Sequence, residues 1–142
     1  EVDAETFLDL ESRAVGFPVR YPDMPEGWIT NSARRSMLAG QPAPVVGWVT
    51  PDRGFIQLTQ TGLDVEAAIE NADSMPRTLD RTVDVDGHPV EVFASEEQDV
   101  RDVWVVDAGD ARFVLTGAGE DREFEELIAT ALATAPIQHP DQ

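Results

Sequence analysis

The sequence contains no cysteine and no lysine. The lack of cysteine excludes disulfides, thiolate chemistry and metal sites with cysteine ligands. The lack of lysine excludes a phosphate-binding loop of the G-x-x-x-x-G-K type. No apolar stretch approaches the roughly 20 residues that a membrane-spanning helix needs. Because the chain opens at Glu1 rather than at Met, we expect any signal or anchor to lie upstream of it.

Positive charge is scarce throughout the chain. There are 28 acidic residues against 10 basic ones, which gives a formal net charge of -18. A surface this negative repels phosphate backbones and anionic lipid headgroups, so we expect neither nucleic-acid binding nor docking onto a membrane surface. The hydrophobic content of 42% nevertheless indicates a folded core.

Apolar spacing and turn signals predict ten elements within a single domain, residues 1–136, followed by a flexible tail, residues 137–142. The expected helices cover residues 3–16, 64–72 and 120–135, and the expected strands cover residues 28–38, 44–50, 55–61, 78–85, 88–94, 100–107 and 111–116. Consecutive strands joined by tight turns pair antiparallel. The predicted fold is therefore α+β, an antiparallel sheet of about seven strands flanked by N- and C-terminal helices and one short helix.

Two features of the predicted helices and strands bear on the core. The first helix begins at the N-cap residue Asp3 and is expected to bury a broad apolar face. That face consists of Phe7, Leu8, Leu10, Ala14 and Val15. Trp48 and Trp104 each lie inside an apolar strand, which is typical of core residues.

No residue pattern indicates catalysis or metal binding. Most carboxylates lie in turns or on polar helix faces, where solvated side chains are the rule. The segment Asp84 to Gly87 resembles part of a calcium loop, but position twelve is Ser95 instead of Glu, and a hairpin turn explains it. His88 and His139 lack partners at helical spacing. We expect no catalytic residues, no bound metal and no cofactor.

Four residues are candidates for binding: Trp28, Arg34, Arg35 and Arg53. Trp28 follows a proline-rich linker at the start of a strand and is positioned to line a groove. Arg34 and Arg35 form a basic pair on a strand, so their side chains point to opposite faces. We expect one of them to form an internal salt bridge and the other to meet solvent or an anionic ligand; charge balancing or protection of an edge strand is the alternative interpretation. Arg53 lies in the turn between two strands.

Several segments carry a family resemblance. Residues 22–28 (Pro-Asp-Met-Pro-Glu-Gly-Trp) resemble a "P-x-x-L-P-x-G-W" entry motif, and residues 47–58 resemble a "G-[FY]-[LV]-T-P-D-G-x-[YF]-x-x-L" hairpin. Residues 83–87 and 113–117 are also similar to the pattern, which covers nearly the whole chain. Met24 and the additional Arg53 depart from it. The segments together resemble an actinobacterial family of functionally uncharacterised proteins, whose members typically carry one N-terminal membrane span and an extracytoplasmic domain.

The resemblance implies a location outside the plasma membrane, tethered through an N-terminal span, and it implies no reaction. We therefore expect a non-enzymatic module that contacts another cell-envelope protein or a small envelope ligand. Two alternatives remain open. One is a carrier whose sheet and helices enclose an apolar cavity for a lipid or isoprenoid. The other is a hydrolase, which would need His88 close to a Ser or Thr and an acid in a cleft.

Overall fold

A computed structural model describes residues 2–138 of the chain and confirms the predicted α+β class. Seven antiparallel strands form one sheet in the order β1-β2-β3-β7-β6-β5-β4. The three helices are α1 (Ala4–Ala14), α2 (Val65–Asn71) and α3 (Asp121–Ala133). The strands are β1 (Ile29–Leu38), β2 (Gln41–Val49), β3 (Phe55–Thr61), β4 (Thr78–Val85), β5 (His88–Ala94), β6 (Val103–Asp107) and β7 (Arg112–Ala118).

The sheet consists of two meanders, β1 to β3 and β4 to β7, which join where β3 pairs with β7. This arrangement leaves β1 and β4 as the edge strands. Gly117, which we expected to end β7, lies within it. The strand expected from residue 100 begins at Val103, because residues 98–102 form a loop along the sheet.

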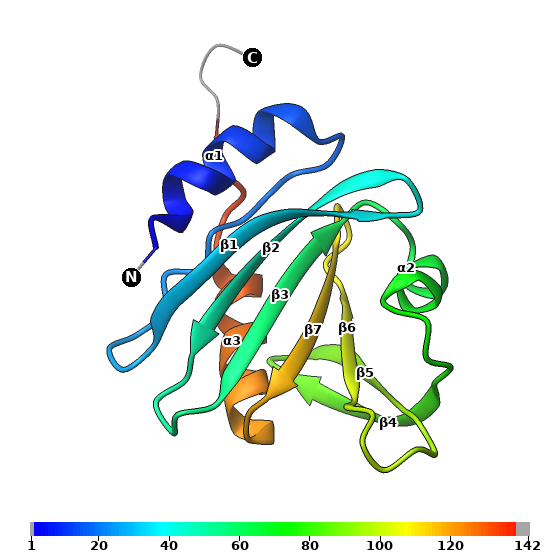
Figure 1. Ribbon diagram of the computed structural model, residues 1–142. Helices are drawn as coiled ribbons and strands as arrows, with labels where there is room; N and C mark the ends of the chain where they lie inside the picture. Colours follow the sequence, from blue (N-terminus) through cyan, green and yellow to red (C-terminus); the bar gives the residue numbers. More distant parts are fainter. Residues whose placement is uncertain (1, 139–142) are drawn as a thin grey trace.

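One face of the sheet, here called the inner face, carries the main core. α3 packs on this face, and α1 and the linker after it also join this core (Figure 1). Trp48 and Trp104 are 1% and 2% exposed, which confirms their predicted core positions. The rings of Trp104 and Phe124 stack with centroids 5.0 Å apart. The space between sheet and α3 is therefore filled by large side chains.

α1 begins at the predicted N-cap, since the Asp3 carboxylate accepts a hydrogen bond from the backbone N–H of Thr6. Its expected apolar face was wrong at two positions: Leu10 is 63% exposed, and Ala14 at the end of the helix is exposed as well. Glu11 is buried in its place, and its carboxylate binds the Arg35 guanidinium at 2.9 Å. α1 therefore turns Glu11, rather than Leu10, toward the sheet, because Arg35 of β1 supplies a positive charge there.

Two polar contacts fix the ends of α3. At its start, the Glu123 carboxylate accepts hydrogen bonds from the backbone N–H groups of Glu120 and Asp52, so the β2–β3 turn is held against the helix. At its end, the half-buried Arg20 donates to the carbonyls of Ala131 and Leu132, each at 3.3 Å. A cation at this position offsets the helix dipole.

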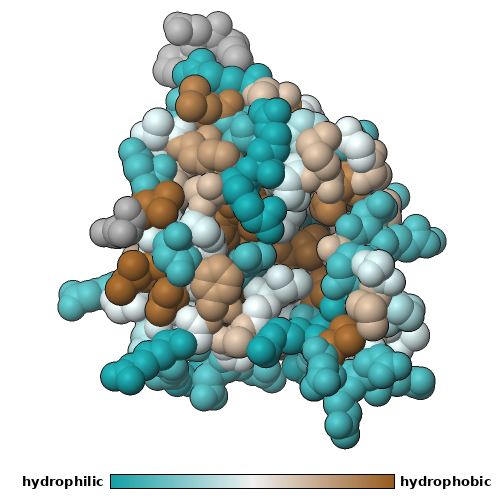
Figure 2. All heavy atoms as spheres, in the orientation of Figure 1, coloured by the Kyte–Doolittle hydropathy of each residue, from teal (hydrophilic) through white to brown (hydrophobic). Residues whose placement is uncertain are grey.

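On the opposite face, here called the outer face, α2 is the only helix among residues 2–138. α2 covers the side chains of Val103, Val105 and Val114 on β6 and β7. The half of this face that β1, β2 and β3 form has no helix over it and is turned toward the viewer in Figures 1 and 2. Figure 2 shows apolar side chains on this face, some of them recessed between polar ones.

The C-terminal segment is docked at its first residue. The backbone N–H of Ile137 donates to the Val19 carbonyl at 2.8 Å, and Ile137 packs against the core. Residues 139–142 of the expected flexible tail, His139 included, lie outside the described residues. Within residues 2–138, no helix combines the length and the apolar character that crossing a bilayer requires.

Candidate functional site

The open half of the outer face carries a row of polar side chains that crosses four strands. Ser32 pairs with Gly47, Gly47 with Gln57, and Gln57 with Thr116. In a sheet, residues in such a row project from the same face. The side chains of Ser32, Gln57 and Thr116 are half-buried and make no hydrogen bond to another residue in 2–138. They therefore present donors and acceptors to solvent or to a partner.

An aromatic ring lies over Gly47 in this row. A Cβ atom built on Gly47 would lie 2.5 Å from Cζ of Phe55 and 2.5 Å from Oγ of Ser32. The Phe55 ring thus occupies the space that a side chain at position 47 would fill. Glycine at this point of a central strand is explained by close approach of the ring. Phe55 itself is half-buried, so part of the ring stays accessible.

A depression of about 470 Å³ opens beside the ring, between β3, β7 and the loops after α2 and before β6. Phe55, Gln57, Met75, Arg77, Arg101 and Thr116 are among the residues that line it. Polar groups and apolar groups therefore meet in one shallow hollow, as they do in many binding sites.

Arg77 holds the two loops that form the rim of this depression. Its guanidinium binds the Asp73 carboxylate at 2.8 Å and the carbonyl oxygen of Arg101 at 3.0 Å. The hydrogen bond from Arg77 is the main cause that lowers the pKa of Asp73; partial burial opposes it, and the backbone N–H of Met75 adds to the lowering. The rim is consequently tied together by a charged contact rather than left as two independent loops.

The arginines separate into two groups. Seven of the ten bind a carboxylate among the described residues. The side chains of the other three, Arg34, Arg53 and Arg101, have no hydrogen bond or ion pair within residues 2–138. Arg101 lines the depression together with Phe55, and Arg53 lies in the turn that comes just before Phe55 in the chain. Arg34 projects from the outer face beside Val45. All three therefore lie on or next to the open half of the outer face.

The structure separates the four residues that the sequence proposed. Arg34 faces outward, whereas Arg35 faces inward and binds Glu11, so the predicted internal salt bridge is confirmed. The hydrogen bond to Glu11 is the first cause that raises the pKa of Arg35. Trp28 lies in the core at 8% exposure instead of lining a groove, and its indole N–H donates to Glu126 at 2.7 Å.

Arg53 is exposed in the β2–β3 turn and has a positive φ of 66°. This left-handed conformation is uncommon for a residue other than glycine. Its backbone N–H donates to the carbonyl of Thr50, which closes the turn. The turn therefore presents the Arg53 side chain at the end of the hairpin, two residues before Phe55.

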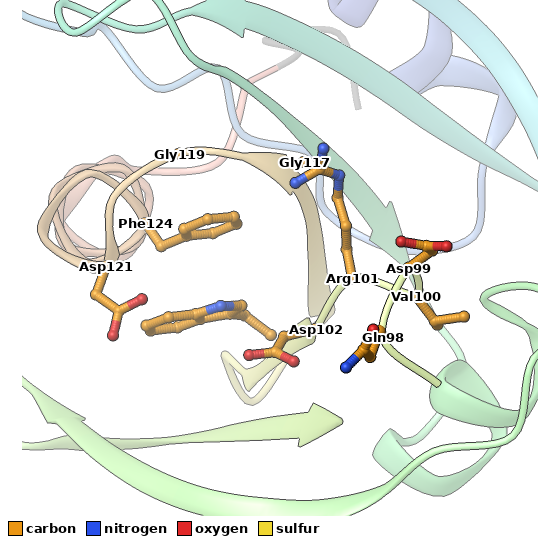
Figure 3. A pocket seen from close by; sticks show the side chains of 10 residues that line it. Gln98, Asp99, Val100, Arg101, Asp102, Gly117, Gly119, Asp121 and Phe124 are labelled. Atoms are coloured by element: carbon orange, nitrogen blue, oxygen red, sulfur yellow. The ribbon is translucent and has the colours of Figure 1, made fainter. Parts of the chain in front are cut away.

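A second depression, of about 400 Å³, adjoins the first and shares Arg101 with it. Its wall contains Trp104, Phe124 and the carboxylates of Asp102 and Asp121. Figure 3 shows Arg101 directed toward β7 at Gly117 and away from those two carboxylates.

Two of the acids that line the second depression, Asp102 and Asp121, already form ion pairs. Arg81 lies over the Trp104 ring at 5.5 Å and forms ion pairs with Asp80, Asp102 and Asp121. The hydrogen bond that Arg81 donates to the Asp80 carboxylate is the first cause that raises the pKa of Arg81. This arrangement is an ion-pair network that joins β4, the loop before β6 and α3, and it explains Asp102 and Asp121 without a ligand.

Neither a metal centre nor a histidine-based catalytic group is found in the part of the chain that the structure describes. No group of three or more His, Asp or Glu side chains is placed to hold a metal ion within residues 2–138. His88 is exposed at the start of β5 and makes no side-chain hydrogen bond to another described residue. The arrangement that the hydrolase alternative requires is thus not present around His88 among those residues.

Sequence reasoning missed Phe55, Gln57 and Arg101. The motif around position 55 was recognised, but its residues were assigned only to a hairpin. The available signal was Gly47 directly across from Gln57, because a glycine inside an otherwise buried strand indicates close approach of another group. Arg101 could not be found in this way, since the pairing of β3 with β7 brings it next to Phe55.

The comparisons with known proteins identify a family and nothing more specific. A family model described as "Protein of unknown function (DUF4245)" matches residues 1–131. No curated protein and no solved structure matches the chain. The match covers most of the sequence and agrees with the expected membership in an uncharacterised family. The chain therefore belongs to the DUF4245 family of proteins of unknown function.

Proposed function

We propose that this domain is a non-enzymatic binding module of an actinobacterial cell envelope, held outside the plasma membrane by an upstream segment. Its binding surface is the outer-face site, which we define as Ser32, Arg34, Arg53, Phe55, Gln57, Arg101 and Thr116. The partner is another envelope protein. The observation that carries the proposal is the coincidence on one open sheet face of an accessible ring, unused hydrogen-bonding side chains and unpaired arginines.

This coincidence is hard to explain by folding alone. In a chain with 28 acidic residues, carboxylates for pairing are abundant, and most arginines have found one. Sheet faces that are not covered by a helix usually carry evenly solvated polar residues. Here the uncovered half holds a flat aromatic ring with polar groups around it, which resembles the anchor-and-rim composition of protein interfaces.

The carrier alternative finds less support. It needs an apolar cavity between the sheet and its helices. Leu127 and Ile128 of α3 are both 0% exposed, and Trp104 stacks on Phe124 in the same layer. The depressions at the outer-face site and beside Trp104 both open to solvent; the first is lined by polar and apolar groups in similar measure, and the second mainly by polar groups. An open hollow of mixed lining suits a surface contact better than it suits a buried lipid chain.

The location outside the membrane is supported by the family resemblance and by the charge. A net charge of -18 keeps a tethered domain away from anionic headgroups, so its free faces remain available to other proteins. A domain held in this way would meet its partner at high effective concentration, because both are confined to the envelope. A weak and open binding surface is sufficient under those conditions.

Site-specific photo-crosslinking in living cells tests the proposal. A photoreactive amino acid replaces Gln57 in the outer-face site of the full-length protein, and a matched variant carries it at Leu10 on α1, which is 63% exposed. We expect a discrete crosslinked partner from position 57 and none of the same mass from position 10. The reasoning fails if the two positions give the same adducts or if position 57 gives none. It also fails if the purified protein turns over ester, glycosidic or phosphate substrates.

A further inference from the structure

We propose that the occupant of the outer-face site is an acidic, extended segment of the partner protein. Its carboxylates pair with Arg34, Arg53 and Arg101, and one apolar side chain packs on Phe55. This inference rests on the proposed function and adds the chemistry of the ligand. The observations behind it are the dimensions of the site, the row of free polar groups and the distribution of charge.

The dimensions exclude a single small anion. Arg34 lies opposite Val45, and Phe55 lies opposite Val49, further along β2. At about 3.3 Å per residue, these two rows are roughly 13 Å apart, and Arg53 lies beyond the second row. One carboxylate or phosphate cannot span that distance. An extended segment of about five residues does so with a carboxylate near each end.

The free polar row fits the same occupant. Ser32, Gln57 and Thr116 cross four strands, so at roughly 4.8 Å per strand they extend over about 14 Å. Their hydroxyl and amide groups both donate and accept hydrogen bonds, which matches the alternating N–H and C=O groups of a peptide backbone. A peptide that runs from Arg34 to Phe55 crosses this row at one point, so its backbone can bind the polar groups nearest the crossing, which the fold leaves unused.

The charge distribution selects a short acidic segment over a long polyanion. With a net charge of -18, the surface as a whole repels a nucleic acid or an anionic membrane that approaches it. Screening confines this repulsion to about 8 Å at physiological ionic strength, so contacts within the site are decided locally. A partner protein with a few carboxylates at the contact is attracted there without carrying a large negative charge elsewhere.

The carboxylates nearest the site differ in how much of the positive charge of its arginines they neutralise. Asp52, beside Arg53, is bound by Arg122, and Asp73 is bound by Arg77. Asp99 lines the same depression as Arg101, and neither forms an ion pair with the other. We therefore expect Arg101 to contribute least to binding, and Arg34 and Arg53 to contribute most.

A peptide titration followed by NMR tests the inference on the whole purified chain. The probe is a capped hexapeptide in which three aspartates alternate with leucine, phenylalanine and valine, and the matched control has asparagine for each aspartate. We expect the acidic probe to shift the signals of Phe55, Gln57 and the free arginine side chains at millimolar concentration. The asparagine control is expected to bind at least fivefold more weakly, because exposed charge pairs contribute modestly.

Charge-reversal variants provide the second arm. We expect Arg34→Glu and Arg53→Glu each to weaken the probe at least threefold. The control Arg13→Glu changes charge equally on α1, where Arg13 is paired with Asp9, and should change binding by less than 1.5-fold. Equal losses for Arg13→Glu and Arg34→Glu would overturn the inference, since they would reflect net charge alone.

The remaining outcomes are equally decisive. Equal binding of the two peptides, or no binding of either, removes the acidic segment as occupant. Equal shifts from inorganic phosphate indicate a small-anion site, and shifts only from vesicles of anionic phospholipid indicate a membrane contact; both overturn the inference. If the double variant Arg34→Glu and Arg53→Glu still gives the crosslink from position 57, the proposed binding surface is supported. The inference that its ligand is acidic is then refuted.

Discussion

Replacing glycine by alanine is expected to destabilise the protein to very different extents at two positions of the sheet. At Gly47 the added Cβ would meet Cζ of Phe55 and Oγ of Ser32, both at 2.5 Å. Both are ends of side chains that can rotate away. At Gly117 the Cβ would collide with the backbone carbonyl of Phe55, and φ is +139°. Neither the backbone nor this φ can adjust cheaply.

The magnitudes follow from these obstacles. Displacing the half-buried Phe55 ring from Gly47 forfeits about 1 kcal/mol of apolar burial, roughly half that of a fully buried side chain. Alanine in place of glycine raises the free energy of unfolding by roughly 0.5 kcal/mol, because it lowers the entropy of the unfolded chain. Gly47→Ala should therefore cost about 1 kcal/mol or less. Gly117→Ala should cost about 2–4 kcal/mol, since strain and backbone displacement add.

Urea denaturation measures the two stabilities, and the NMR signals of the Phe55 ring report its position. We expect Gly47→Ala to keep the fold, to shift the Phe55 ring signals and to weaken the acidic hexapeptide about fivefold, the equivalent of roughly 1 kcal/mol. If Gly47→Ala destabilises the protein as much as Gly117→Ala, or leaves the Phe55 signals unchanged, the account of the ring on the outer face is refuted.

Three further predictions concern the contacts that hold the domain together. Arg20→Met should lower the free energy of unfolding by about 2 kcal/mol, because two carbonyls at the end of α3 lose their charged hydrogen-bond donor. In the same urea titration, the surface control Arg13→Met should lower it by less than about 0.5 kcal/mol. Trp28→Phe should cost about 1–2 kcal/mol in a thermal melt, because it removes the hydrogen bond to Glu126, and an unchanged melting temperature would contradict this. The folded pKa of Asp73 is lowered, so its contribution to stability is complete above the unfolded pKa of about 3.9 and is lost as pH falls through the folded value. Asp73→Asn should therefore reduce the acid dependence of unfolding below about pH 4, and an identical pH profile in the variant would count against the Arg77 contact.

The sequence predicted the elements well because the local signals were strong. Alternating apolar residues, turn residues such as Asp86-Gly87 and N-caps such as Asp3 all act within a few residues. The Asp3 carboxylate accepts a hydrogen bond from the backbone N–H of Thr6, as an N-cap should. Agreement of several local signals with one fold is typical of natural sequences.

The errors arose where distant segments meet. Leu10 was expected to be buried, but Glu11 is buried because Arg35 of β1 lies opposite it. Trp28 was expected in a groove, but α3 covers it and supplies the acceptor Glu126. No spacing along the chain reveals such contacts, since they depend on how helices pack on the sheet.

The candidate site was predictable only in part. Arg34 and Arg53 were singled out as cations in an acidic chain, and both remain without a described partner. Which face Arg34 takes depends on an irregularity of register in β1 between Thr30 and Ser32. Such a bulge changes the alternation of side chains, and nothing in the local composition marks it. Arg101 joins the site only through the order of strands in the sheet.

The central claim is that the open half of the outer face is covered by a partner in the cell. Hydroxyl-radical footprinting of the full-length protein, on intact cells and after purification, tests it directly. Phe55 and Met75 lie at the site, whereas Met37, 55% exposed on β1, follows the opposite alternation from Arg34 and serves as the reference. We predict that oxidation of Phe55 and Met75 falls on cells while that of Met37 does not. Equal oxidation of Phe55 in both samples, or equal protection of all three residues, would contradict the account.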